Sequence, residues 1–151
     1  MKVRFGLVMV LALIGACSSP PQLNGTGIWV DPAAQIRPVR TSDCPQDPLT
    51  TFEMTFNLTQ TGQDLTGTVR FSKPGEPTVV YGDVSAQVRN EGQVRGRITL
   101  YSQSGSPISF SFEGRLYVSA FAGRTIEPLP SLCPSRNQPV DSYLQWDAAK
   151  R

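Results

Sequence analysis

The 151-residue chain contains no histidine, the side chain that most often acts as a catalytic base or metal ligand near neutral pH. Its absence excludes a histidine-based triad and an imidazole ligand set. The sequence also lacks a G-x-S-x-G nucleophile elbow and a glycine-rich phosphate loop. The carboxylates Glu53, Asp83 and Glu113 fall on polar strand faces, where solvent surrounds them, rather than in a cleft suited to acid–base work. We therefore predict a protein that is not an enzyme and has no metal or cofactor.

Long hydrophobic runs are also missing, since a helix that crosses a bilayer needs about 20 apolar residues. The longest run, Phe5–Ala16, has twelve residues and follows the basic residues Lys2 and Arg4. A basic start and a short apolar stretch are typical of a secretory signal peptide, which is removed before the protein folds.

The apolar run ends in Ile14-Gly15-Ala16-Cys17, which resembles the lipobox of bacterial lipoproteins. The resemblance implies cleavage before Cys17, acylation of Cys17 (with palmitate among the acyl chains) and attachment to a membrane of the cell envelope. Ser18, rather than Asp, follows the cysteine, which by the sorting rule of enteric bacteria implies the outer membrane if the organism has one. An ordinary secretory signal with a chance cysteine is the alternative.

No excess of one charge remains in the mature chain. Removal of residues 1–16 leaves 135 residues (151 − 16), with 12 basic side chains (14 − 2) against 12 acidic ones. A neutral domain has no general electrostatic footprint for nucleic acid, so we expect no nucleic-acid partner. Several arginines fall on polar strand faces, as a solvated exterior or as a basic patch toward lipid headgroups or a partner: Arg70, Arg89, Arg95, Arg97, Arg115 and Arg124.

The remaining sequence is dominated by alternation of apolar and polar residues. In Thr51–Phe71 this alternation runs on both sides of a short glycine-containing turn, which predicts a β-hairpin with one buried face. The same pattern recurs along the chain and predicts eight strands: 26–30, 51–60, 64–72, 78–89, 93–101, 107–118, 121–127 and 140–146. For residues 141–151 a helix is the competing interpretation, because Asp141 suits a helix cap and Ala148-Ala149-Lys150 favours helix.

Sequential hairpins without crossover helices predict an antiparallel meander, and closing it into an up-and-down barrel removes the sheet edges. Gly67, Gly96 and Gly123 recur at the same point of three return strands, where a sheet that curls into a barrel needs bends. Plain β-sandwich turns are the alternative explanation. We predict an all-β fold with three segments: signal peptide 1–16, lipidated tether 17–24 and barrel domain 25–151.

Gly27-Ile28-Trp29 matches the Gly-x-Trp motif on the first strand of lipocalins and their relatives. Together with the strand pattern, the chain resembles small bacterial lipocalin-like, calycin-type barrels that carry a lipobox signal. Lipocalins place an arginine of the last strand against this tryptophan, and the expected strand 140–146 has none.

Cys44 and Cys133 are the two cysteines left once Cys17 is lipidated, and an oxidising compartment favours one disulfide between them. They lie in two long proline-containing connections, 31–50 and 128–139. In an eight-stranded up-and-down barrel these connections share one end and lie side by side, because the first and last strands are neighbours. The long loops should therefore form a mouth at this end, opposite the tight turns and the lipid tether. Closing 88 intervening residues should stabilise the fold by roughly 4 kcal/mol.

The apolar face of the strands is the candidate ligand site, because eight strands enclose either a filled interior or one small ligand. Bulky side chains would fill the space, whereas Gly67, Gly82, Gly96 and Gly114 would open it. The candidate interior residues are Trp29, Phe52, Met54, Phe56, Phe71, Val84, Ile98, Phe110 and Phe112. Two hypotheses remain open: an anchored barrel that binds a small apolar ligand at its mouth, and a filled barrel that docks onto or inhibits an envelope protein.

Overall fold

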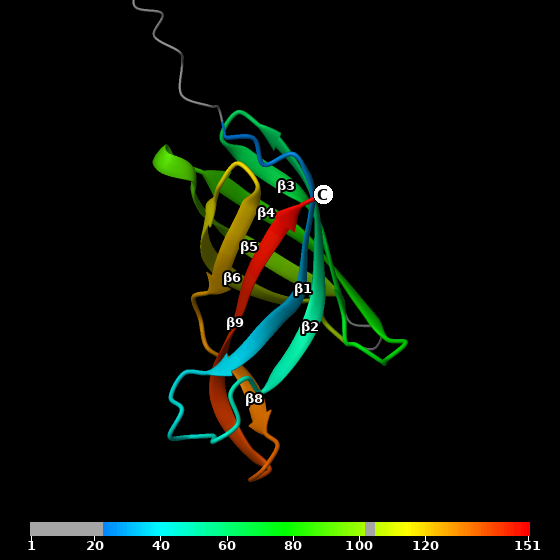
Figure 1. Cartoon of the computed structure of the whole chain (residues 1–151), viewed down its shortest axis with the longest axis vertical. Helices are drawn as coiled ribbons and strands as arrows, with labels where there is room; N and C mark the ends of the chain where they lie inside the picture. Colours follow the sequence, from blue (N-terminus) through cyan, green and yellow to red (C-terminus); the bar gives the residue numbers. More distant parts are fainter. Residues whose placement is uncertain (1–22, 102–104) are drawn as a thin grey trace, which may run out of the picture.

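The structure, a computed structural model, describes residues 23–101 and 105–151. It is a single antiparallel sheet with the strand order β1-β2-β3-β4-β5-β6-β7-β9-β8, in which β1 also pairs with β9. Eight strands therefore close a barrel, as predicted, and β8 adds a ninth strand at one end (Figure 1). The strands are β1 (Gly27–Pro38), β2 (Thr50–Thr61), β3 (Asp64–Ser72), β4 (Val79–Val88), β5 (Gln93–Tyr101), β6 (Ile108–Leu116), β7 (Ala120–Thr125), β8 (Leu129–Cys133) and β9 (Gln138–Lys150), with the short 3-10 turn η1 (Asn90–Gly92) before β5.

The first strand is more than twice as long as the predicted segment 26–30, and the expected loop 31–50 shrinks to residues 39–49. The strand continues through a bulge, where its pairing with β2 and β9 shifts register after Asp31 and Val30. The buried Asp31 carboxylate supports this bulge: Oδ1 accepts a hydrogen bond from the Ala33 N–H (2.8 Å) and Oδ2 accepts one from the Asp147 N–H (2.7 Å). The bulge breaks the two-residue period at Pro32, which hid the strand in the sequence.

The chain after residue 128 also forms more strand than predicted. The expected loop 128–139 contains β8, and the expected strand 140–146 extends to Gln138–Lys150. Alternate residues of β9 are buried, from Val140 through Ala148, so this segment is a strand and the helical alternative for 141–151 is wrong. Its N-terminal half pairs with β8 and its C-terminal half with β7, while β1 runs along its other edge.

The longer last strand brings a cation to the Gly-x-Trp tryptophan after all. Trp29 is fully buried, and its Nε1 donates to the Gly25 carbonyl oxygen at 2.9 Å. Lys150 Nζ lies 5.1 Å from the centroid of the Trp29 ring, within the range of a cation–π contact. The predicted strand 140–146 stops short of Lys150, because the alternation of β9 fades in Ala148-Ala149.

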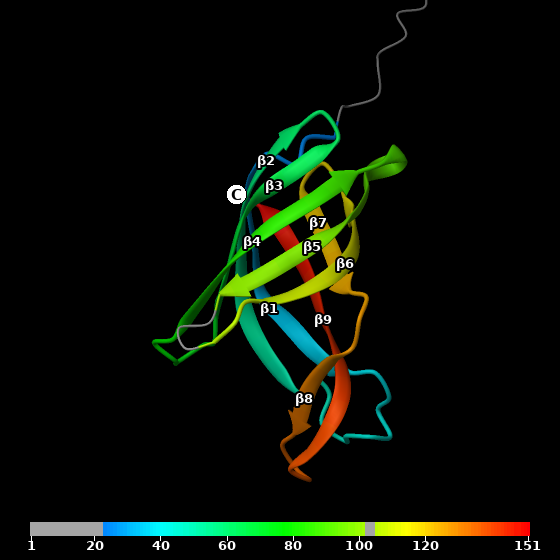
Figure 2. The same ribbon diagram turned by 180° about the vertical axis from the view of Figure 1, so that it is seen from behind.

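The two ends of the barrel differ as predicted. The β2–β3, β4–β5 and β6–β7 turns lie at the end where the described chain begins, and we call this end the base (Figures 1 and 2). The longer connections lie at the opposite end, the mouth, where β8, the first half of β9 and loop 39–49 project beyond the rest of the barrel. Cys44 and Cys133 form a disulfide in this projection, with Cα atoms 5.6 Å apart, as predicted.

The recurrent glycines lie where neighbouring backbones approach closely. A Cβ atom on Gly67 would collide with the Asn57 carbonyl oxygen of β2, and one on Gly96 would collide with Ala86 of β4. Gly123 lies under the indole of Trp146, which occupies the space that a side chain would need. These contacts explain why the inward positions at the bends of the sheet carry no side chain.

The half of the interior nearer the base is packed with aromatic rings. Phe121 contacts Trp29, Phe56, Phe112 and Trp146 with ring centroids 5.2–6.4 Å apart in edge-to-face geometry. All five rings are at most 1% exposed. This aromatic cluster closes the barrel from the base side.

Within the part of the chain that the structure describes, no helix has both the length and the apolar character needed to cross a membrane.

Candidate ligand site at the barrel mouth

On the mouth side of the aromatic cluster, the barrel contains a small cup that is lined only by apolar side chains. Its volume is about 160 Å³. Seven strands of the closed barrel's wall and the added strand β8 supply its lining: Ile36, Phe52, Phe71, Val80, Leu100, Phe110, Leu129 and Leu144. The barrel is therefore filled at its base and hollow at its mouth. The sequence left a filled and a hollow interior as alternatives, and each describes one half of the barrel.

The size of the cup limits what it can hold. An apolar protein cavity of about 150 Å³ is large enough for benzene, whereas sites for drug-sized ligands measure about 300–1,000 Å³. The cup thus has room for one aromatic ring or for one end of an alkyl chain, and the rest of a longer ligand would extend out of the mouth.

Hydrogen bonds hold the two leucines that β8 and β9 contribute to the cup. The buried Ser142 Oγ donates to the Leu129 carbonyl oxygen at 2.7 Å and lies 2.7 Å from Ser131 Oγ. Further along the same edge of β9, the buried Thr125 Oγ1 of β7 accepts a hydrogen bond from the Leu144 N–H at 3.1 Å. These contacts fix the backbone of both strands, so the wall of the cup is preformed.

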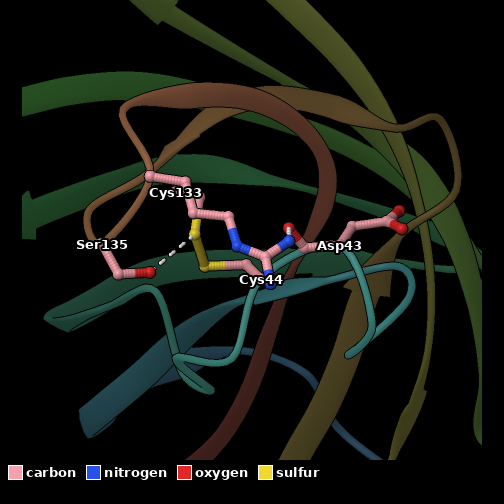
Figure 3. The surroundings of a disulfide bond; sticks show 5 residues. Asp43, Cys44, Cys133 and Ser135 are labelled. Carbon is pink, nitrogen blue, oxygen red and sulfur yellow. Dashed lines mark hydrogen bonds between the residues drawn. A yellow bond between two sulfur atoms is a disulfide. The ribbon is translucent and has the colours of Figure 1, made fainter.

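The disulfide ties loop 39–49 to the same wall. Cys44 and Cys133 are fully buried against Val140 and Leu49, in a small cluster separate from the main core. Ser135 Oγ lies 3.4 Å from Cys133 Sγ, and Figure 3 shows this contact on one side of the disulfide and Asp43 next to Cys44 on the other. Because Cys133 ends β8, the disulfide anchors the strand that supplies Leu129 to the cup.

Of the nine predicted interior residues, only Phe52, Phe71 and Phe110 line the cup. Phe52 and Phe71 meet edge to face, with ring centroids 6.4 Å apart. The other six lie deeper, in the packed core: Trp29, Met54, Phe56, Val84, Ile98 and Phe112. The difference arises from height along the barrel, which alternation does not reveal.

Five residues of the cup are not among the predicted interior residues: Ile36, Val80, Leu100, Leu129 and Leu144. Val80 and Leu100 lie in the predicted strands 78–89 and 93–101, and their distance from the tight turn between these strands is the signal that could have singled them out. Ile36 and Leu129 lie in strands that were predicted to be loops. No sequence signal marks these two residues.

Exposed apolar side chains surround the mouth. Among the residues that the structure describes, nine large apolar residues are exposed, and six belong to the mouth half of the molecule: Val39, Tyr81, Tyr101, Ile108, Ile126 and Leu132. Tyr81 and Tyr101 are directly paired neighbours on β4 and β5. The Tyr101 hydroxyl donates to Asp83 Oδ2 at 2.6 Å, and this hydrogen bond raises the pKa of Tyr101.

A larger concavity lies on the outer wall over β5, β6, β7 and β9, with a volume of about 760 Å³. Four arginines line it: Arg89, Arg95, Arg115 and Arg124. Two of these pair with carboxylates, Arg115 with Glu91 at 3.2 Å and Arg124 with Glu113 at 2.9 Å. The concavity is open to solvent and its charges are partly compensated, so it fits a ligand less well than the cup does.

Across residues 23–101 and 105–151, no three histidine, cysteine, aspartate or glutamate side chains cluster where they could hold a metal ion. The residues predicted to form the signal peptide, and Cys17, lie outside the described residues.

Comparisons of the chain with protein-family models, with curated proteins and with solved structures found no match. The barrel is consistent with a lipocalin-like fold, and the function has to be argued from the geometry of the cup.

Proposed function

We propose that the protein is a lipid-anchored lipoprotein of the bacterial cell envelope that binds one small apolar group in the cup at its mouth. The cup itself carries this proposal, because it is a preformed, open cavity whose lining has no polar side chain. An apolar group that enters it leaves water without leaving any buried polar atom unpaired. The chemistry is binding rather than catalysis, and we propose neither a cofactor nor a metal for it.

The ligand class follows from size. At about 25 cal/mol per Å² of apolar surface removed from water, a benzene-sized group contributes only a few kcal/mol, so the cup alone binds weakly. A long-chain lipid would gain more by laying further methylenes against the exposed apolar residues of the mouth. We propose the end of an acyl or alkyl chain as the natural occupant.

Displacement of a fluorescent probe tests this proposal. We expect N-phenyl-1-naphthylamine to brighten on binding the protein and 1-octanol to displace it. In Val80→Phe the larger ring fills part of the cup, and we expect at least a tenfold loss of affinity. In Val79→Phe the same change lies on the opposite face of β4 and should have no effect. Equal affinities for the two variants would disprove binding in the cup.

The anchor is tested separately. We expect mass spectrometry of the mature protein to find Cys17 as an acylated N-terminal residue. A Cys17→Ala variant should fail to be processed as a lipoprotein. An unmodified Cys17 in a processed chain would support the ordinary secretory signal instead.

The exposed apolar residues around the mouth favour a second candidate function, docking onto an envelope protein. In that case an apolar side chain of the partner would occupy the cup, and Tyr81 and Ile108 would be buried at the edge of the interface. A pull-down from envelope fractions distinguishes the two functions. A stable protein partner that is lost in Tyr81→Ser/Ile108→Ser would favour docking, and a lipid copurifying with the wild type would favour the carrier.

A further inference from the structure

Among the described residues, the three exposed large apolar residues that do not belong to the mouth half gather at the base. Tyr117 and Val118 form the tip of the β6–β7 turn, with exposed fractions of 48% and 65%, and Ile28 on β1 is 47% exposed. Backbone hydrogen bonds bring them together with the end of β9: the Lys150 N–H donates to the Ser119 carbonyl oxygen and the Arg151 N–H donates to that of Ile28, both at 2.9 Å.

Basic side chains surround this tip. We define the base patch as Ile28, Arg89, Arg115, Tyr117, Val118, Lys150 and Arg151. Gly92 of η1 packs against the Leu116 carbonyl oxygen, so the turn that follows Arg89 lies beside the β6–β7 tip. Four cationic side chains stand at this end against the side-chain carboxylates of Asp64 and Glu91 and the α-carboxylate of Arg151, and Glu91 already pairs with Arg115.

The mouth end has the opposite balance. Its connections carry an excess of one negative charge (three basic and four acidic side chains): Arg40, Lys73 and Arg136 against Asp43, Asp47, Glu76 and Glu127. An exposed apolar tip within a basic rim therefore distinguishes the base from the mouth, although both ends expose apolar side chains. Apolar tips flanked by lysine and arginine are the composition of surfaces that lie on anionic lipid.

The described chain begins at the same end. Leu23 is half-buried against the core and touches the site of Gly92, and Gly25 N–H donates to Gln60 Oε1 at 2.6 Å. Six residue steps separate Leu23 from Cys17, and even a fully extended chain covers no more than about 20 Å in six steps. A lipid on Cys17 would therefore hold the base close to the bilayer.

We propose that the base patch rests directly on an anionic lipid bilayer, with Tyr117 and Val118 at the level of the headgroups and the arginines on lipid phosphates. The lipid anchor of the proposed function brings the base to the bilayer, whereas the contact itself uses only the chain's own side chains. The barrel then stands on its base, and the cup opens away from the membrane.

Vesicle binding tests the contact without the anchor. The barrel, its core and its disulfide lie within residues 23–151, so an unacylated chain that starts at Ser18 retains all of them. We expect it to cosediment with vesicles of phosphatidylcholine and phosphatidylglycerol, and hardly at all with pure phosphatidylcholine. Removal of one arginine of the patch, as in Arg89→Gln, should lower the partition coefficient about fivefold, and 0.5 M salt should weaken binding further.

The two ends of the barrel supply matched variants. Tyr117→Ser/Val118→Ser should reduce partitioning about tenfold, whereas Tyr81→Ser/Ile108→Ser, which removes equally exposed apolar groups at the mouth, should leave it unchanged. The reverse result would place the mouth on the membrane and overturn the proposal, as would a failure of the wild-type chain to bind anionic vesicles. Far-UV circular dichroism checks that all variants fold.

The outcome is separable from that of the proposed anchor. Acylation of Cys17 without vesicle binding by the unacylated chain would leave the anchor standing and disprove the contact. Vesicle binding by a chain whose Cys17 is not acylated in the cell would support the contact and disprove the anchor.

Discussion

Gly67 shows at the scale of one residue how the sheet is curved. It is paired with Leu58 and Val84, and a Cβ atom there would collide with the Asn57 carbonyl oxygen. The backbone atoms of β2 and β3 cannot move apart without breaking the hydrogen bonds of the hairpin. The position therefore has no room for even one methyl group.

We predict that Gly67→Ala lowers the free energy of unfolding by about 3 kcal/mol, the upper range for overpacking. Urea unfolding followed by tryptophan fluorescence measures the change. Gly62→Asn is the control, because Gly62 (φ 62°) lies in an open turn where asparagine is tolerated, so the loss should stay below about 1 kcal/mol. Equal losses in the two variants would contradict the close approach.

Glu127 at the mouth provides a prediction about protonation. Two hydrogen bonds from Ser111 lower the pKa of Glu127. The Ser111 hydroxyl donates to the Glu127 carboxylate and has the larger effect, and the Ser111 N–H donates to Glu127 Oε2 at 2.7 Å. A lowered pKa in the folded state means that this interaction stabilises the fold above the unfolded-state pKa and is lost as the pH falls through the folded-state pKa.

We expect Ser111→Ala to raise the pKa of Glu127 part of the way to its ordinary value, since the backbone N–H remains. Titration of the Glu127 carboxyl carbon by NMR measures this change. Ser109 lies on the same strand as Ser111, and its hydroxyl pairs with that of Thr99 on β5. Ser109→Ala should therefore leave the pKa of Glu127 unchanged. An unaltered pKa in Ser111→Ala would show that the hydroxyl takes no part.

At the scale of single elements, the bulge of β1 decides the length of the first strand. Asp31 satisfies two backbone N–H groups that the interrupted ladder leaves free. We predict that Asp31→Ala costs about 2 kcal/mol of unfolding free energy, because two donors lose their acceptor. Asp141→Ala, an exposed carboxylate of β9, should change stability by no more than about 0.5 kcal/mol. Differential scanning calorimetry measures the melting temperatures of both variants. Equal melting temperatures would contradict the role of Asp31 in the bulge.

The disulfide acts on the projection formed by β8, the first half of β9 and loop 39–49. It joins cysteines 89 positions apart, and in the chain-entropy model such a closure contributes about 4 kcal/mol. We predict that the Cys44→Ser/Cys133→Ser variant loses stability on this scale in urea unfolding, and that reduction of the wild type reproduces the loss. If the midpoint does not move, the projection is held by its hydrogen bonds alone.

For the whole molecule, ligand binding should be visible as stability. A ligand that binds only the folded barrel adds about 2.7 kcal/mol when it is present at 100 times its Kd. For a domain of this size we predict a rise in Tm of about 10 °C with saturating 1-octanol. At the same ligand concentration the rise should fall by about half or more in Val80→Phe, as a tenfold or larger loss of affinity requires, and persist in Val79→Phe. A rise of equal size in both variants would place the ligand outside the cup.

The strand pattern, the barrel closure and the disulfide could all be predicted, because they depend on the inward or outward direction of each side chain. Alternation with a period of two encodes this direction locally, as in Phe52, Met54 and Phe56 on β2. The bulge at Asp31 is not visible in the sequence, because its carboxylate bonds to Asp147, more than 100 residues away. The strand β8 is not visible either, because its proline-containing segment shows no alternation.

The cup could be predicted only in part. Phe52 and Phe56 are both aromatic, inward and four residues apart, yet one lines the cup and the other is buried in the aromatic cluster. Their difference is height along the barrel axis, which is set by the register of all eight strands together. By itself the sequence determined which side chains point inward and which cysteines meet. Only the tertiary structure decided where the interior is filled and where it is open, because packing depends on side chains that distant strands bring to the same level.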